Sequence, residues 1–287
     1  MKTHPLPPLG LVALLSVGLA TQASAGIFSN NIDMLVVAEG ANGSHQQSGP
    51  APYAAFDGGY IEAGDPIAGD TPPTAAQVSQ SLQAALANLG YQKAAPAPSV
   101  VLTYHWGVLR IDHRQIRVPY GIKTNLEARI ELVSTGPLGA EVENHILLNE
   151  KAGGLNPDAA APRFLVGPAE TVKQDARQPR IFVIVSAYDY QGLLHREAKL
   201  LWRAKLSARE QSGRMDEVIP ALITGGSVFF GKDITEPRLV EVTPRSVPAA
   251  AGPVPGASAE ALNLDRQFID GLLKAEHARF SGYTGDN

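Results

Sequence analysis

Two stretches, IFVIVSAYDY (Ile181–Tyr190) and KLLWRAKLS (Lys199–Ser207), indicate the fold of this 287-residue chain most directly. The first is apolar on both faces until Asp189, which is typical of a strand inside a sheet. The second alternates along its length, as a strand with two different faces does. The short link between them, Gln191–Ala198, predicts an antiparallel hairpin. One side of the second strand would carry Leu200, Trp202, Ala204 and Leu206, and the other Lys199, Arg203 and Lys205, with Leu201 as the exception.

Further strands are expected on both sides of this hairpin in the sequence. Ser99–Leu109 begins with residues that are apolar on both faces, so it predicts a second interior strand. Ile32–Glu39 is a short apolar strand, and Tyr53–Ala63 a strand interrupted by Gly58-Gly59. The alternation at Leu126–Leu132 predicts a strand with one face in water. A further strand is expected around Glu143–Leu148, within the weakly patterned excursion Gly136–Gln178.

Three segments have the periodicity of amphipathic helices. Thr74–Leu89 begins with an N-cap residue and is followed by Gly90, which supplies a left-handed stop. A second helix is expected from Ser212, with Pro220 predicting a kink, and Gly225-Gly226 closing it before a short strand at Val228–Gly231. The third is a tail helix, Asp265–Phe280, with apolar anchors at Phe268, Ile269, Leu272, Leu273 and Phe280.

These elements together predict an α+β fold. The sheet would be mixed and mainly antiparallel, with Thr74–Leu89 and Arg214–Thr224 packed on one face and a C-terminal helix added. The expected organisation is a signal peptide at 1–25, an α+β envelope domain at 26–243, a Pro/Ala-rich linker at 244–258 and a C-terminal amphipathic helix and tail at 259–287.

The first residues have the three parts of a secretory signal. Lys2 and His4 precede the apolar run Leu9–Ala20, and Ala23-Ser24-Ala25 fits the small-residue cleavage pattern. A run of this length makes roughly 18 Å of helix, too short to span a bilayer. We therefore expect cleavage near Ala25 and a periplasmic or secreted protein.

Composition excludes several function classes. The chain has no cysteine, which removes disulfides, thiolate nucleophiles, cysteine-ligated zinc and iron–sulfur clusters. Its formal net charge of −4 argues against nucleic acid as a partner, because nucleic-acid binders normally carry a basic stripe.

Two groups of residues could carry chemistry. His105, Asp112 and His113 could ligate a metal, although a histidine between Tyr104 and Trp106 more often packs at a sheet surface. Ser186, Asp189 and His195 contain the residue types of a hydrolase triad, but Ser186 would lie in mid-strand and no Gly-x-Ser-x-Gly elbow is present.

Two further motifs favour structural readings. GSVFFGKD (Gly226–Asp233) has Asp233 where a phosphate loop needs Ser or Thr, and it follows a helix instead of a strand. RIDHRQIR (Arg110–Arg117) could bind an anionic lipid or glycan, but a solvated loop face is the simpler expectation, since Asp112 interrupts it. We therefore assign no catalytic, cofactor-binding or metal residues, and no cofactor.

The order of several short motifs resembles a bacterial envelope domain of unknown function that usually occurs in lipoproteins. These motifs are the helix ending in Leu89-Gly90-Tyr91, the strand ending in Tyr104-His105-Trp106, and the hairpin with Tyr188-Asp189 and Leu201-Trp202-Arg203. The resemblance covers about Tyr53 to Pro237. It is similar in outline to transport auxiliary lipoproteins and implies a small antiparallel sheet backed by helices, with no catalytic residues. The lipid-bearing cysteine of such proteins is absent here.

Two functions follow as expectations. The first is a non-catalytic periplasmic module that binds an envelope protein or component through its sheet edge or tail helix. The alternative is a periplasmic hydrolase or metal-dependent enzyme that uses His105, His113 or Asp189.

Overall fold

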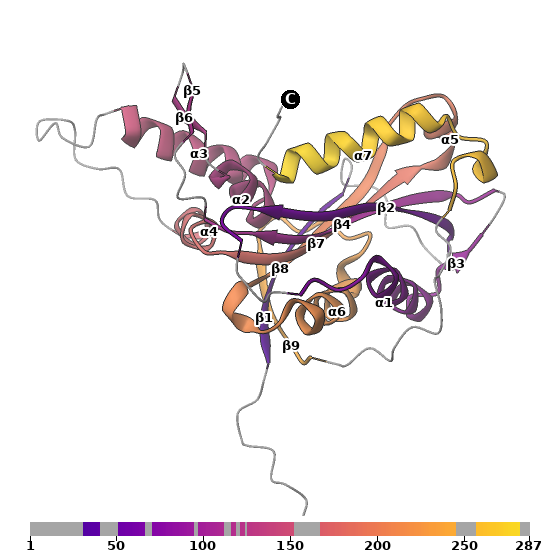
Figure 1. Ribbon diagram of the computed structural model, residues 1–287, viewed down its shortest axis with the longest axis horizontal. Helices are drawn as coiled ribbons and strands as arrows, with labels where there is room; N and C mark the ends of the chain where they lie inside the picture. Colours follow the sequence, from indigo (N-terminus) through magenta and orange to yellow (C-terminus); the bar gives the residue numbers. More distant parts are fainter. Residues whose placement is uncertain are drawn as a thin grey trace, which may run out of the picture.

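The computed structural model describes residues 31–40, 51–66, 71–94, 97–111, 116–118, 121–123, 125–151, 167–244 and 257–281. Within these ranges the chain forms three layers, with a mixed sheet between two layers of helices (Figure 1). The predicted α+β class is confirmed.

A seven-stranded sheet in the order β3-β2-β4-β7-β8-β1-β9 forms the middle layer. β2 runs parallel to β3 and β4, and the remaining pairs are antiparallel. The predicted hairpin is confirmed as β7 and β8, whose link contains the short helix α5 (Tyr190–Leu194). The strands are β1 (Ile32–Gly40), β2 (Pro52–Ala63), β3 (Gln92–Lys93), β4 (Val100–Leu109), β7 (Arg180–Asp189), β8 (Leu200–Arg209) and β9 (Arg238–Val242), with a separate pair β5 (Ile116–Val118) and β6 (Gly121–Lys123).

One face of the sheet carries α1 (Ala75–Asn88) and α6 (Met215–Gly226), as predicted (Figure 1). Thr74 caps α1 in a reciprocal arrangement, because its hydroxyl accepts from Gln77 N–H at 3.3 Å while the Gln77 side chain accepts from Thr74 N–H at 2.8 Å. Gly90 has a φ of +83° and ends the helix, as expected. The main apolar core lies between these two helices and the sheet, around Trp202.

The opposite face is covered by four helices from the middle and the end of the chain (Figure 1). The predicted C-terminal helix is present as α7 (Arg266–Ser281) and packs against β2 and β4. The other three helices were not expected from the sequence. They are α2 (Leu126–Val133), α3 (Gly136–Lys151) and α4 (Pro168–Ala176).

Three predicted strands are wrong. Leu126–Leu132 forms α2, whose Arg129 is buried together with its apolar neighbours because helices and sheet surround it. Glu143–Leu148 lies inside α3, since a short apolar run does not distinguish helix from strand. Val228–Gly231 overlaps the 3₁₀ turn η2 (Ser227–Phe229). The expected linker lies mostly outside the described residues.

Two remaining 3₁₀ turns complete the described chain. These are η1 (Glu210–Ser212), directly after β8, and η3 (Glu260–Leu262), which precedes α7.

Candidate functional site

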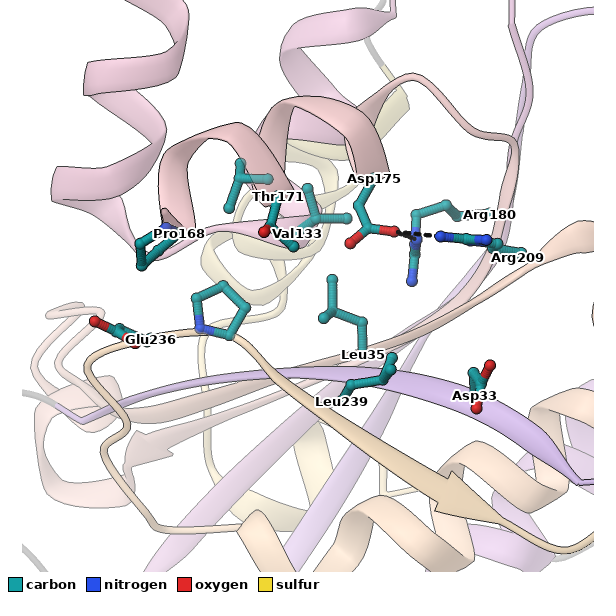
Figure 2. Close-up of a pocket in the computed structure, with 12 residues that line it drawn as sticks. Asp33, Leu35, Val133, Pro168, Thr171, Asp175, Arg180, Arg209, Glu236 and Leu239 are labelled. Atoms are coloured by element: carbon teal, nitrogen blue, oxygen red, sulfur yellow. Dashed lines mark hydrogen bonds and ion pairs between the residues drawn. The ribbon is translucent and has the colours of Figure 1, made fainter. Parts of the chain in front are cut away.

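A groove of about 400 Å³ opens between α4 and the edge of the sheet formed by β1 and β9 (Figure 2). Leu35 of β1 and Leu239 of β9 are direct register partners and form its floor. Val133 and Val172 line the wall above. Leu239 is 67% exposed, so an apolar surface on the sheet edge remains open to solvent at this place.

At one end of the groove a carboxylate faces two guanidinium groups (Figure 2). Asp175 Oδ1 lies 2.9 Å from Arg180 Nη1 and 3.6 Å from Arg209 Nη2. Arg180 is buried and also donates from Nε to Ser207 Oγ at 2.9 Å, which fixes its position. Burial lowers the pKa of Arg180, although Asp175 partly offsets this. The Arg209 side chain is 55% exposed, so its guanidinium is accessible at the mouth of the groove.

Carboxylates lie along the rest of the rim. Asp33 and Glu236 are exposed and lie near opposite ends of the groove (Figure 2). A second, wider cavity of about 730 Å³ adjoins the first and shares Pro168 and Glu236 with it. Its charged lining is mainly acidic, and Arg279 is the cation among the residues that line it.

A buried polar cluster lies under α7 on the same face of the sheet. Its centre is Glu276, whose carboxylate accepts hydrogen bonds from Thr103 Oγ1 at 2.6 Å, Arg203 Nη2 at 2.7 Å and Tyr188 OH at 2.8 Å. His105 Nε2 lies 3.5 Å from the same carboxylate. Burial raises the pKa of Glu276, but the nearby His105 imidazole, the hydrogen bond from Thr103 and the charge of Arg203 outweigh it and hold the pKa far below its usual range.

This cluster attaches the tail helix to the sheet and is closed to substrates. His105 is fully buried and Glu276 is 4% exposed. Burial, followed by the negative charge of Glu276, raises the pKa of Tyr188, which therefore stays protonated and donates. The geometry supports a structural role.

The residues proposed for catalysis or metal binding do not converge in the described chain. Asp189 pairs with Val100, five positions before His105 on β4, so His105 and Asp189 are about 17 Å apart at 3.3 Å per residue. Asp189 caps α5 by accepting from Gly192 N–H at 3.0 Å. Asp112 and His113 lie outside the described residues, and no group of three potential metal ligands occurs within them.

The serine candidate is also held in a structural contact. Ser186 Oγ accepts from Arg203 Nε at 2.9 Å and is fully buried in mid-strand. His195 lies at the end of α5, several residues beyond the strand end. Ser186, Asp189 and His195 therefore do not form the relay that a hydrolase needs.

The two remaining motifs have packing roles where they are described. A Cβ on Gly226 would lie 2.4 Å from the Leu206 side chain, so the start of GSVFFGKD packs on the core instead of curling around a phosphate. Arg110 was expected on a solvated loop face, and this was wrong. It is buried, with Nη1 2.6 Å from Glu62 and Nε 2.6 Å from Glu210.

Sequence reasoning missed Glu276 and the groove. A signal for Glu276 was present, because it follows Ile269 by seven residues and precedes Phe280 by four, which places it on the buried face of the tail helix. The groove had no such signal, since its walls come from segments that are far apart in the sequence.

Comparisons with known proteins give little similarity. No family model matches the chain, and no curated protein matches it. Among solved structures, a PDZ domain protein from Parabacteroides distasonis aligns over 75% of this chain with 9% identity and a TM-score of 0.38. This chain covers 40% of the length of that structure. Within the described residues, no helix combines the length and apolar character needed to cross a membrane.

Proposed function

We infer that the protein is a non-catalytic binding module of the bacterial envelope. The groove between α4, β1 and β9 would receive an extended segment of a partner protein that inserts an apolar side chain. The observation that carries this proposal is the open apolar floor beside the sheet edge, where Leu239 remains 67% exposed. Export rests on the three-part signal pattern before Ala25.

A partner polypeptide fits this groove better than a small polar molecule. β9 is an edge strand that pairs with β1 on one side, so its outer backbone groups can pair with an incoming strand. The floor offers Leu35 and Leu239 to one apolar side chain of that strand. The other sheet edge, β3, has two residues and offers much less backbone.

The tail helix, expected earlier as a second contact surface, is engaged within the molecule. Its Glu276 carboxylate is already bonded to Arg203 inside the molecule, and Ile269 and Phe280 are buried. The enzyme alternative is not carried forward, since His105 is sealed and Asp189 serves as a helix cap.

Selection of random peptides displayed on phage tests the groove. The mature chain, beginning at Gly26, is immobilised, and the enriched peptides are synthesised and titrated. Leu239→Glu is expected to weaken their binding at least about tenfold, since it places a charge on the apolar floor. Val228→Glu is the matched control, because Val228 is 50% exposed but lies in η2, outside the groove lining.

The control is expected to bind within about twofold of the wild type, because a surface charge away from the contact changes little. Both variants alter exposed side chains, so unchanged unfolding midpoints would show that the fold is intact. Enriched peptides that bind Leu239→Glu as tightly as the wild type would rule out the groove, and so would a selection that enriches none.

A further inference from the structure

The second cavity, beside the groove, is lined by carboxylates whose charge is not offset within the described chain. Glu141 of α3 lines it together with Asp233 and Glu236 of the segment before β9, and all three residues are exposed. Asp233 accepts a hydrogen bond from the Gly40 backbone N–H at 3.3 Å, which leaves its charge in place. None of the three forms an ion pair with any residue that the structure describes. Three negative charges therefore line one cavity without a paired cation.

The other charged groups of the second cavity are paired with residues outside its lining. Arg279 Nη2 lies 2.8 Å from Glu131 Oε1, so its charge is offset on α2. Glu39 lies 3.1 Å from the buried Lys205 Nζ. These pairs leave the cavity with a negative potential, which favours a cationic group from outside the described chain.

The second cavity continues the groove beyond the start of the edge strand. Glu236 lines both cavities and lies at the end of the groove opposite Arg180 and Arg209 (Figure 2). Leu239 follows Glu236 by three residues, so at most about 11 Å of chain separates them. Pro237 has no N–H, so strand pairing along β9 ends there. An incoming strand with an apolar side chain over Leu239 therefore reaches the second cavity within two to four residues.

We propose that the segment bound in the groove carries Lys or Arg two to four residues from its apolar side chain, and that this cation enters the second cavity. The proposal rests on the binding function inferred above and specifies the chemistry of the partner. Leu138 and Ile234 also line the cavity, so the aliphatic stem of either cation has apolar contacts while its charged end meets the carboxylates.

The sequences of the displayed peptides enriched on the wild-type chain give the first test. Lys and Arg are expected to be enriched about threefold or more over the unselected library, at a fixed spacing on one side of the apolar residue. Selection in about 0.3 M salt suppresses general attraction of basic peptides to a chain with a net charge of −4. Enriched peptides without basic residues, or with basic residues at no fixed spacing, would overturn the proposal.

Charge reversal assigns the cation to the second cavity. Glu236→Lys is expected to weaken an enriched basic peptide about fivefold or more, and the same peptide with Gln at the basic position less than about twofold. A peptide with Glu at that position should bind Glu236→Lys more tightly than it binds the wild type. Fluorescence anisotropy with labelled peptides measures all three.

Glu197→Lys is the matched control, because it makes the same charge change at an exposed residue outside both cavities. Glu197 follows α5, which joins the ends of β7 and β8 opposite those that reach the groove. The control should bind the basic peptide within about twofold of the wild type. Unchanged unfolding midpoints would show that both variants are folded.

The outcomes separate the cation from the groove. Peptides that lose affinity in Leu239→Glu but bind Glu236→Lys and the wild type equally would overturn the cation site and leave the groove supported. Equal weakening by Glu236→Lys and Glu197→Lys would also overturn it, since the attraction would then come from the net charge alone. Peptides that are insensitive to both Leu239→Glu and Glu236→Lys would exclude the cation site and the proposed function together.

Discussion

Gly58 and His105 occupy adjacent space in the middle of the sheet. A Cβ on Gly58 would lie 2.1 Å from His105 Cε1, well inside contact distance. The register between β2 and β4 shifts between Asp57 and Tyr60, so a bulge at Gly58-Gly59 makes room for the imidazole. The His105 ring on the neighbouring strand therefore explains why glycines interrupt this strand: a larger side chain at Gly58 would overlap the ring.

Gly58→Ala is expected to destabilise the protein by about 1–3 kcal/mol, because the added methyl group overlaps the His105 ring. Combining it with His105→Ala should recover part of this loss, since the second change removes the overlapping ring. Urea unfolding of the single and double variants measures both effects. Gly271→Ala on α7 is the control: its Cβ would meet nothing within 4 Å, so it should be neutral or stabilising. Purely additive losses would exclude the contact.

At the scale of elements, α7 shows how a correctly predicted helix can have an unpredicted attachment. Its apolar anchors were read from the sequence, and Ile269 and Phe280 are buried as expected. The helix is also attached by a charge, because Glu276 meets Arg203 of β8 at 2.7 Å with both side chains 5% exposed. Removing one partner from such a buried pair leaves the other without compensation.

Glu276→Gln is expected to cost about 3–5 kcal/mol, since the neutral amide leaves the Arg203 guanidinium buried without a counter-charge. Glu260→Gln, at an exposed pair with Arg266 at 3.4 Å, should cost less than about 1 kcal/mol. Chemical denaturation followed by fluorescence of the two tryptophans compares them. Equal losses in the two variants would contradict a central role for the buried pair.

At the scale of the whole molecule, buried charges join the helical layer to a polar sheet face. Lys205 Nζ on β8 donates to the carbonyls of Glu131 at 2.8 Å and Ser134 at 2.7 Å, which lie at the end of α2. It also pairs with Glu39 at 3.1 Å. The lysine is fully enclosed, so the sheet face that carries it needs the helices as partners.

The buried carboxylate of Glu276 predicts that the stability of the folded protein depends on pH. The pKa of Glu276 in the folded protein lies below its ordinary value of 4.5, so the folded state favours the ionised form. Its contribution is therefore fully present at pH 7 and is lost as the pH falls below about 4.5 toward the folded pKa. Unfolding free energies measured between pH 7 and pH 3 should decline, and the decline should be shallower in Glu276→Gln. Parallel pH profiles of the two proteins would show that other carboxyl groups are responsible.

The sequence by itself determined the strands and helices whose residues differ clearly between faces. The hairpin around Asp189, the helix after Thr74 and the tail helix follow from spacing and capping, which are local properties. The strand predicted at Leu126–Leu132 was wrong because the alternation shows which side chains are polar, but not which other elements surround the segment.

Only the tertiary structure decided what covers the polar sheet face and where a ligand can bind. The contacts of Glu276 reach residues 73 and 173 positions away, Arg203 and Thr103, and those of Lys205 reach Glu131 at 74 positions. Periodicity shows that the two faces of a strand differ in polarity. A buried charge, however, is stable only beside its partner. Partners this far apart in the sequence are brought together only when the helical layer packs on the sheet. The groove at Leu239 depends on the same packing, because α4 and β9 meet only in the folded chain.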